Sequence, residues 1–294
     1  MTCVAIKRDR ILVYIAAIII GLYSIGPIYS LVIISLMDVR DVVAGHIFPY
    51  NPNINAYLRV VGFDVQGPYG FLRAYGGSRQ LMQGLLNISI IAPIVMIITL
   101  LASIPAGYAL GRFRIGRLRS ILIIILLGTR SLPPVSVALP YFFLFTQLGL
   151  RSTLQGMIII HLTITVPIVT WILMGFFAAL PQDLEKAARI DGCSRLAALF
   201  KVVLPLAAPG IAASAIIAFL FSWNDFFYSW LLSQGTSAAT YNAQLSGFFN
   251  FQNEPAMFAA AVTLQIIVAT IIASVLQKYI TQLKIVDPGT VVVE

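Results

Sequence analysis

Few residues in this sequence could take part in chemistry, and three of them are ionisable side chains within long apolar segments. Arg130, His161 and Asp225 each stand in such a segment, and Asn224 directly precedes Asp225. Charged side chains at membrane depth are costly, and they usually face a cavity or a partner inside the protein. These four residues are therefore our candidates for lining a translocation pathway.

Motifs for covalent or metal chemistry are missing from the sequence. It contains no G-x-x-x-x-G-K-[ST] loop, because Gly111 to Gly116 is followed by Arg117 and Leu118. It also contains no H-E-x-x-H pair and no nucleophile elbow. Cys3 and Cys193 are far apart, so we predict free thiols and no metal site. We expect no catalytic residue, and hence no enzyme.

Position along the expected helices separates the ionisable residues in depth. Arg130 follows Arg119 by 11 residues, which places it about 16 Å deep, near the midplane, and His161 at a similar depth. Asp225 follows Leu206 by 19 residues and should lie about 28 Å along its helix, near the outer surface. A direct pair of Arg130 with Asp225 is therefore not expected. Arg130 either faces a cavity or bonds backbone carbonyls freed by the Pro133–Pro134 pair.

The elements that must position these residues are membrane helices. Of the 294 residues, 59% are hydrophobic and only 10% are charged, far below the share in soluble domains. A helix needs about 20 apolar residues to cross a bilayer. We predict six spans: 11–37, 83–110, 120–146, 153–180, 206–232 and 255–280. Arg130 and the Pro133–Pro134 pair interrupt the third span. We expect the first span to be retained and not cleaved as a signal peptide.

Loop charges predict the orientation. With the N-terminus inside, thirteen of the nineteen Lys and Arg residues fall on the inner side and five on the outer side. Basic residues gather in cytoplasmic loops, so we expect both termini in the cytoplasm of a multi-pass plasma-membrane protein. The outer loop 38–82 is rich in aromatic residues, and it either docks an external protein or lies in the membrane interface.

One stretch between the fourth and fifth spans has the charged, mixed composition of a soluble protein. It is "LEKAARIDGCSRLAALFKVVLPLAAPG", residues 184–210. Leu184, Ala187, Ala188 and Asp191 recur at helical spacing, and Gly192 ends or bends that helix. Small side chains allow another surface to approach closely. The residues alone leave two interpretations open, a docking surface for a protein or an amphipathic helix on the inner leaflet.

This stretch resembles the Glu-Ala-Ala loop of ABC-importer permeases, whose pattern continues with glycine, isoleucine and Leu-Pro at fixed spacing. The spacing is kept here, with Lys186 at the glutamate position, Glu185 before it and Val202 at the isoleucine position. The similarity extends from about residue 83 to 279 and is to the maltose-type sugar permeases. The residues that this likeness assigns to ATPase coupling are Glu185, Lys186, Ala187, Ala188, Asp191, Gly192, Leu204 and Pro205.

The resemblance implies an all-α membrane protein with six transmembrane helices, the type I ABC importer permease fold, and a cytoplasmic coupling helix between helices 4 and 5. It divides the chain into an N-terminal helix with an external loop (1–82), a permease domain (83–280) and a cytoplasmic tail (281–294). The ending "QLKIVDPGTVVVE" departs from the family's usual tail, so tail contacts are not carried over.

The implied function is ATP-driven import of a sugar by alternating access. The implied partners are a second, different permease, two copies of an ABC ATPase that hold ATP and Mg²⁺, an external lipid-anchored or membrane-tethered sugar-binding protein, and membrane lipid, with no nucleic acid. The rival interpretations are a permease for another solute, such as a polyol phosphate or an oligopeptide, and an ion-driven secondary transporter.

The run Trp223-Asn224-Asp225 matches the family's Trp-Asn-Asp turn. Its amide and carboxylate could contact sugar hydroxyls from the outer cavity. With the aromatic residues that follow, it could instead anchor the helix end in the membrane interface, which is the interpretation we favour.

Overall fold

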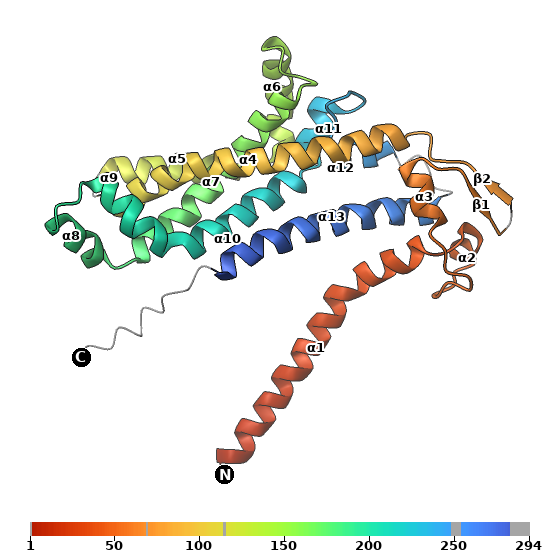
Figure 1. Ribbon diagram of the computed structural model, residues 1–294, viewed down its shortest axis with the longest axis horizontal. Helices are drawn as coiled ribbons and strands as arrows, with labels where there is room; N and C mark the ends of the chain where they lie inside the picture. Colours follow the sequence, from red (N-terminus) through yellow and green to blue (C-terminus); the bar gives the residue numbers. More distant parts are fainter. Residues whose placement is uncertain (1, 69, 114–115, 248–253, 283–294) are drawn as a thin grey trace. The chain divides into compact units, whose positions relative to one another are not determined.

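The computed structural model describes residues 2–68, 70–113, 116–247 and 254–282 (Figure 1). These residues are helical apart from loops and one short antiparallel hairpin, β1 (Val65–Gly67) with β2 (Gly70–Leu72), in which Gln66 lies opposite Phe71. The helices are α1 (Thr2–Ser35), α2 (Val39–Val43), α3 (Asn55–Val61), α4 (Ser78–Arg112), α5 (Arg117–Ser131), α6 (Pro134–Gln147), α7 (Leu154–Ala179), α8 (Gln182–Ile190), α9 (Arg195–Ala198), the π-helical turn η1 (Leu199–Val203), α10 (Leu204–Trp223), α11 (Phe227–Ser233), α12 (Tyr241–Leu245) and α13 (Pro255–Gln282).

Within these described ranges, five helices are long and apolar enough to cross a membrane. They cover residues 13–35, 78–112, 154–179, 195–223 and 255–275. A sixth span is possible if the bent pair of α5 and α6 counts as one. The prediction of an all-α membrane protein with six apolar spans is therefore confirmed, with the third span in two pieces.

The break in the third span has a local cause. The axes of α5 and α6 differ by 95°. Leu132 is extended, with φ −75° and ψ 125°, because a residue followed by proline is pushed out of the helical region. Pro134 then begins α6, where its missing N–H costs no hydrogen bond. The interruption that we expected within 120–146 at the Pro133–Pro134 pair is therefore a sharp bend between two separate helices.

The fifth span also differs from our expectation of 206–232. Its helix ends at Trp223, and a separate short helix, α11, begins at Phe227. Asn224 at the end of α10 turns its own side chain back, donating from Nδ2 to the Leu220 carbonyl at 3.0 Å. The chain therefore changes direction at Asn224 and Asp225.

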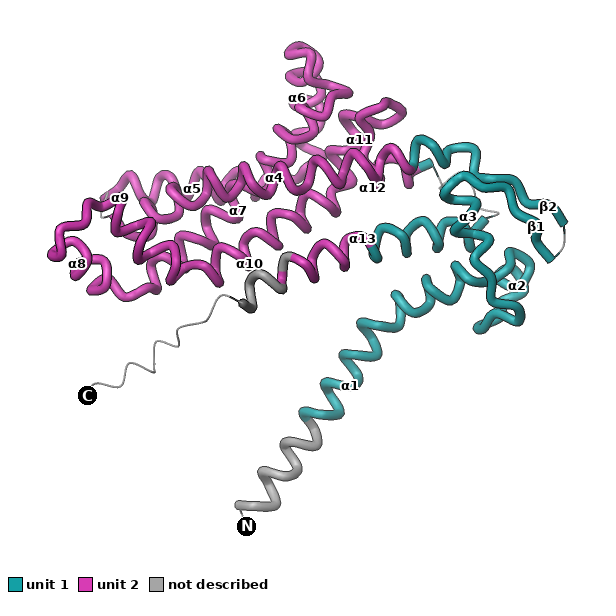
Figure 2. The backbone as a smooth tube through the Cα atoms, viewed as in Figure 1, with its two compact units in different colours: residues 1–81, 247–267 teal, residues 82–246, 268–294 magenta. Residues whose placement is uncertain are grey.

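The chain divides into two compact units, which Figure 2 colours separately. Unit 1 comprises Met1–Leu81 and Gly247–Ile267, and unit 2 comprises Met82–Ser246 and Val268–Glu294. The expected cytoplasmic tail falls at the end of the chain, where residues 283–294 lie outside the described residues.

A largely buried ion pair joins the two chain segments of unit 1. The guanidinium of Arg59, in α3, donates to both carboxylate oxygens of Glu254 at 2.9 Å, and its Nε donates to the Arg73 carbonyl at 2.7 Å. The Arg59 side chain is only 10% exposed and that of Glu254 is 25% exposed. Paired, hydrogen-bonded burial of this kind is tolerated because each charge is satisfied.

The core of unit 2 lies where α4, α7 and α10 meet. Its buried side chains include Tyr108, Leu173, Phe177 and Val203. Glycine allows α4 to approach α7, since a Cβ on Gly107 would lie 2.9 Å from the Leu173 side chain. This core places the C-terminal end of α4 beside the segment that carries α8.

Candidate functional site

The segment between α7 and α9 contains one short helix, α8 (Gln182–Ile190), with defined ends. Pro181 precedes it, and Asp183 and Glu185 stand in its first turn, where carboxylates suit the positive end of the helix dipole. At its other end, the N–H of Gly192 donates to the Arg189 carbonyl at 3.2 Å and that of Cys193 to the Ala188 carbonyl at 3.0 Å. Gly192 has φ +90°, so the helix stops at the residue where glycine is needed.

The side chains of α8 are almost all outside the protein core. None of its residues is buried, Ala188 is half-buried, and Leu184 and Ile190 are 46% and 85% exposed. Lys186 donates to Asp183 at 2.8 Å on this exposed surface, and this hydrogen bond lowers the pKa of the Asp183 carboxyl. Burial of α8 therefore does little to fix it in place.

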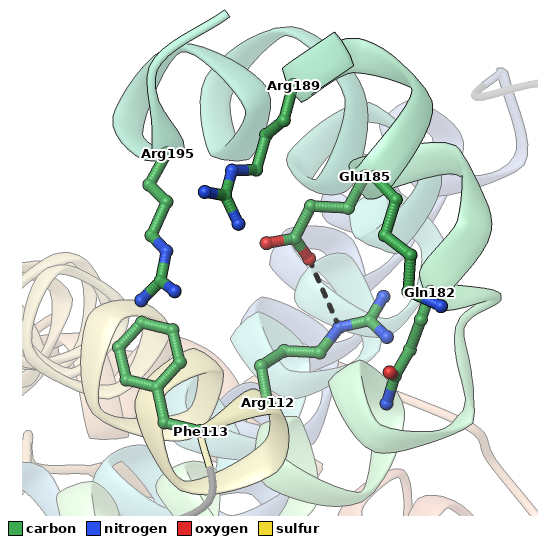
Figure 3. Close-up of a pocket in the computed structure, with 7 residues that line it drawn as sticks. Arg112, Phe113, Gln182, Glu185, Arg189 and Arg195 are labelled. Carbon is green, nitrogen blue, oxygen red and sulfur yellow. Dashed lines mark ion pairs between the residues drawn. The ribbon is translucent and has the colours of Figure 1, made fainter.

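Glu185 is the exception, and it connects α8 to the C-terminal end of α4. The Tyr108 hydroxyl donates to its Oε1 at 2.6 Å. Arg112 Nε lies 3.6 Å from its Oε2 (Figure 3). Arg112 also donates to the Leu180 carbonyl at 2.9 Å, just before α8 begins. We call Tyr108, Arg112 and Glu185 the α4–α8 link.

The Leu204–Pro205 end of the candidate motif begins α10. Pro205 stands in the first turn of α10 and has no N–H to donate to a carbonyl of the preceding turn. The chain passes through the π-helical turn η1 immediately before it. Sequence reasoning missed this turn, and the tyrosine and arginine of the α4–α8 link as well.

A second polar cluster lies within unit 2, around His161 in α7. His161 is fully buried; its Nδ1 is 2.8 Å from Ser222 Oγ, and its Nε2 is 3.2 Å from Ser229 Oγ. The same Nε2 lies 3.3 Å from Asp225 Oδ2, which accepts the Ser229 backbone N–H at 2.9 Å. Every polar atom of the imidazole ring therefore has a partner.

This cluster corrects the depths expected from the sequence. We placed His161 near the midplane and Asp225 near the outer surface, but the two side chains are in contact. Because α7 begins at Leu154, His161 is only about 10 Å from that end. Helix α11 folds back against α7 after the chain turns at Asp225, which brings the carboxylate to the imidazole.

Arg130 and Asp225 line the same cavity, whose volume is about 600 Å³. Asn224 and the aromatic residues Phe221, Phe227 and Tyr228 also line it. The Arg130 guanidinium lies 5.9 Å from the centre of the Phe221 ring. In the described part of the chain, Arg130 has neither an ion pair with Asp225 nor a hydrogen bond to the carbonyls near Pro133.

Among the described residues, no three His, Cys, Asp or Glu side chains are placed to hold an ion. Cys193 is half-buried with a free thiol.

Comparisons with known proteins agree on one class. Residues 103–285 match a family described as the inner membrane component of binding-protein-dependent transport systems. The chain is 30% identical to the trehalose/maltose transport system permease protein MalG of Thermococcus litoralis, over 92% of this chain and 93% of that protein. It is 31% identical to the sulfoquinovosyl glycerol transport system permease protein SmoH of Agrobacterium fabrum, over 72% and 70%.

The fold is also found in a solved structure. A bacterial ABC transporter involved in the import of the acidic polysaccharide alginate contains a chain that aligns with a TM-score of 0.68 and 21% identity, covering 93% of this chain and 98% of that one.

Proposed function

The chain belongs to the family of inner membrane components of binding-protein-dependent transport systems, and from this premise we propose how it couples ATP hydrolysis to the import of a sugar. It is the permease subunit of an ABC importer and not itself an enzyme. The observation that carries the proposal is the exposed helix α8, held to α4 by the α4–α8 link. We propose that α8 is the coupling helix and that it lies in the cytoplasm with both termini.

The geometry of α8 suits the transfer of force. Its exposed face, which carries Leu184, Ala187 and Ile190, is free to seat on another protein. Its opposite face is joined through Glu185 to α4, and α4 packs in the same core as α7 and α10. A push on α8 would therefore move the ends of three membrane helices together. Two such permeases moved in opposite senses would expose a central site alternately to each side.

The partners follow from what the chain lacks and from its family. No phosphate-binding loop is present in the sequence, so ATP and Mg²⁺ would be held by two copies of a separate ATPase. A second permease would complete the pathway. An external binding protein, tethered to the membrane, would deliver the substrate, and this arrangement is consistent with the family description.

The substrate class is supported by the relatives and by the cavity. The relatives carry names for trehalose, maltose and sulfoquinovosyl glycerol, all of them saccharides or saccharide conjugates. The 600 Å³ cavity combines the side chains of Arg130, Asn224 and Asp225 with aromatic rings. Sugars present hydroxyl groups and apolar faces, and such a lining offers partners to both.

The proposal predicts a specific neighbour for Ala187. A short thiol cross-linker on Ala187→Cys, in a Cys193→Ser background and in membranes that contain the whole transporter, should join the permease to the ATPase subunit. ATP hydrolysis by the reconstituted complex should rise with the matching saccharide in a panel of mono- and disaccharides. Cross-links to lipid or solvent alone would refute the coupling role of α8. Uptake driven by an ion gradient without an ATPase would support the secondary-transporter alternative.

The role of the cavity can be tested at Arg130. Since the guanidinium lines the cavity with no ion-pair partner among the described residues, Arg130→Leu should lower sugar uptake by about tenfold, the loss of one charge-assisted hydrogen bond. The measurement is uptake into proteoliposomes, with Arg117→Leu at the exposed start of α5 as the control. Unchanged uptake would exclude Arg130 from the pathway.

A further inference from the structure

A basic pocket lies between the end of α4, one face of α8 and the start of α9 (Figure 3). Its volume is about 160 Å³. Gln182, Glu185, Lys186 and Arg189 line it from α8, where the spacing of 3, 4 and 7 residues places them on one helix face. The cations Arg112 and Arg195 line it from α4 and α9. Four cations thus surround a single carboxylate.

The charges of this pocket do not balance internally. Glu185 is engaged by Tyr108 and Arg112, and Lys186 is paired with Asp183. Arg189 and Arg195 have no ion-pair partner in the described part of the chain. The Arg195 guanidinium instead lies 5.1 Å from the centre of the Phe113 ring, which holds it at the pocket. Two arginines are therefore available to an incoming anion.

Arg112 adds an unsatisfied group at the base of the pocket. Its side chain is only 4% exposed, and its Nε has no hydrogen-bond partner among the described residues, because Glu185 Oε2 is 3.6 Å away. A buried donor without a partner is destabilising. A carboxylate that entered the pocket would meet the guanidinium groups of Arg189 and Arg195, which are strong donors to carboxylates.

The surroundings of the pocket favour a protein over a free ion. Leu184, Ile190 and Leu196 are 46%, 85% and 69% exposed on the same short segment. Exposed apolar side chains on a short segment that also carries unpaired arginines are typical of a protein interface. We propose that the basic pocket receives an acidic side chain of the ATPase subunit. This inference rests on the proposed function, and it assigns the negative charge at this contact to the ATPase, since Lys186 stands where the motif carries glutamate.

The experiment begins with a photo-reactive amino acid at Gln182, which lines the pocket without being one of its cations. In the assembled transporter it should cross-link to an ATPase segment that contains aspartate or glutamate. Arg189→Glu with Arg195→Glu should weaken ATPase binding to the permease about tenfold or more. Reversing the charge of the cross-linked acidic residue should restore it. Lys201→Glu, an exposed cation of η1 outside the pocket, is the matched control.

The outcomes separate the pocket from the proposed function. If both arginine reversals leave ATPase binding unchanged while Ala187→Cys still cross-links to the ATPase, the pocket proposal is overturned and the coupling helix stands. If Ala187→Cys reaches no ATPase, the proposed function fails first. A rise in the melting temperature of the permease alone with inorganic phosphate at constant ionic strength, lost in Arg189→Gln and Arg195→Gln, would show a free anion as the occupant and overturn the assignment to the ATPase.

Discussion

Replacing Glu185 with alanine is expected to lower substrate-stimulated ATP hydrolysis by about tenfold or more while the ATPase still binds the permease. The substitution removes the acceptor of the Tyr108 hydroxyl and the carboxylate beside Arg112. A hydrogen bond to a charged group contributes about 1.5–3 kcal/mol, and each 1.4 kcal/mol is about a factor of ten. Helix α8 would keep its exposed face but lose its attachment to α4. ATPase binding and hydrolysis are measured separately in the reconstituted complex.

Two further variants test whether the effect comes from the contact between Glu185 and α4. Tyr108→Phe removes only the hydroxyl and should cause a smaller loss of coupling than Glu185→Ala. Asp183→Asn removes another carboxylate of the same helix, and the Asp183 side chain is 90% exposed. This variant should therefore couple ATP hydrolysis to transport normally. Normal coupling in Glu185→Ala would contradict a transmitting role. Loss of ATPase binding in that variant would mean that Glu185 contacts the ATPase directly.

Replacing Glu254 with alanine is expected to lower the free energy of unfolding by about 3–5 kcal/mol. The change leaves Arg59, only 10% exposed, as a charge without a carboxylate. Replacing Arg59 with alanine should lower the free energy of unfolding by less, because the Glu254 side chain that remains is 25% exposed and can reach water. Unfolding of the full chain in mixed micelles gives both values.

A double replacement separates the effect of charge on stability from the effect of packing. Arg59→Met with Glu254→Met removes both charges and should recover much of the loss, since an apolar pair is often as stable as a buried ion pair. Asp183→Ala breaks an exposed pair and should leave the free energy of unfolding nearly unchanged. A double variant as unstable as Glu254→Ala would show that the lost stability comes from packing and not from charge.

Much of the architecture could be predicted because its signals are local. Apolar length gave the spans, since a helix in lipid must satisfy its own backbone. The Pro133–Pro134 pair marked the weak point of the third span, and the structure breaks there. Gly192 was expected to end a helix, and its positive φ is the reason that it does. The motif that carries the family resemblance is likewise a fixed spacing along one segment.

Less of the candidate site than of the architecture could be predicted from the sequence. Sequence identified Glu185, His161 and Asp225 as important residue types but did not specify which side chains each one meets. The family resemblance assigned Glu185 to ATPase coupling, and within the folded chain both of its carboxylate oxygens face α4. His161 was expected to lie far from Asp225 in depth, yet the two are 3.3 Å apart. These contacts join residues 77 and 64 positions apart in the sequence.

Taken alone, the sequence determined the membrane class, the approximate positions of the apolar helices and the short charged helix with its glycine stop. Each of these depends on residues within a few helical turns of one another. Only the tertiary structure decided the partner of Glu185, the return of α11 to His161 and the unbalanced arginines of the basic pocket. Such contacts depend on how separate helices pack, and hydrophobic periodicity along one helix does not specify which polar groups a neighbouring helix brings to it.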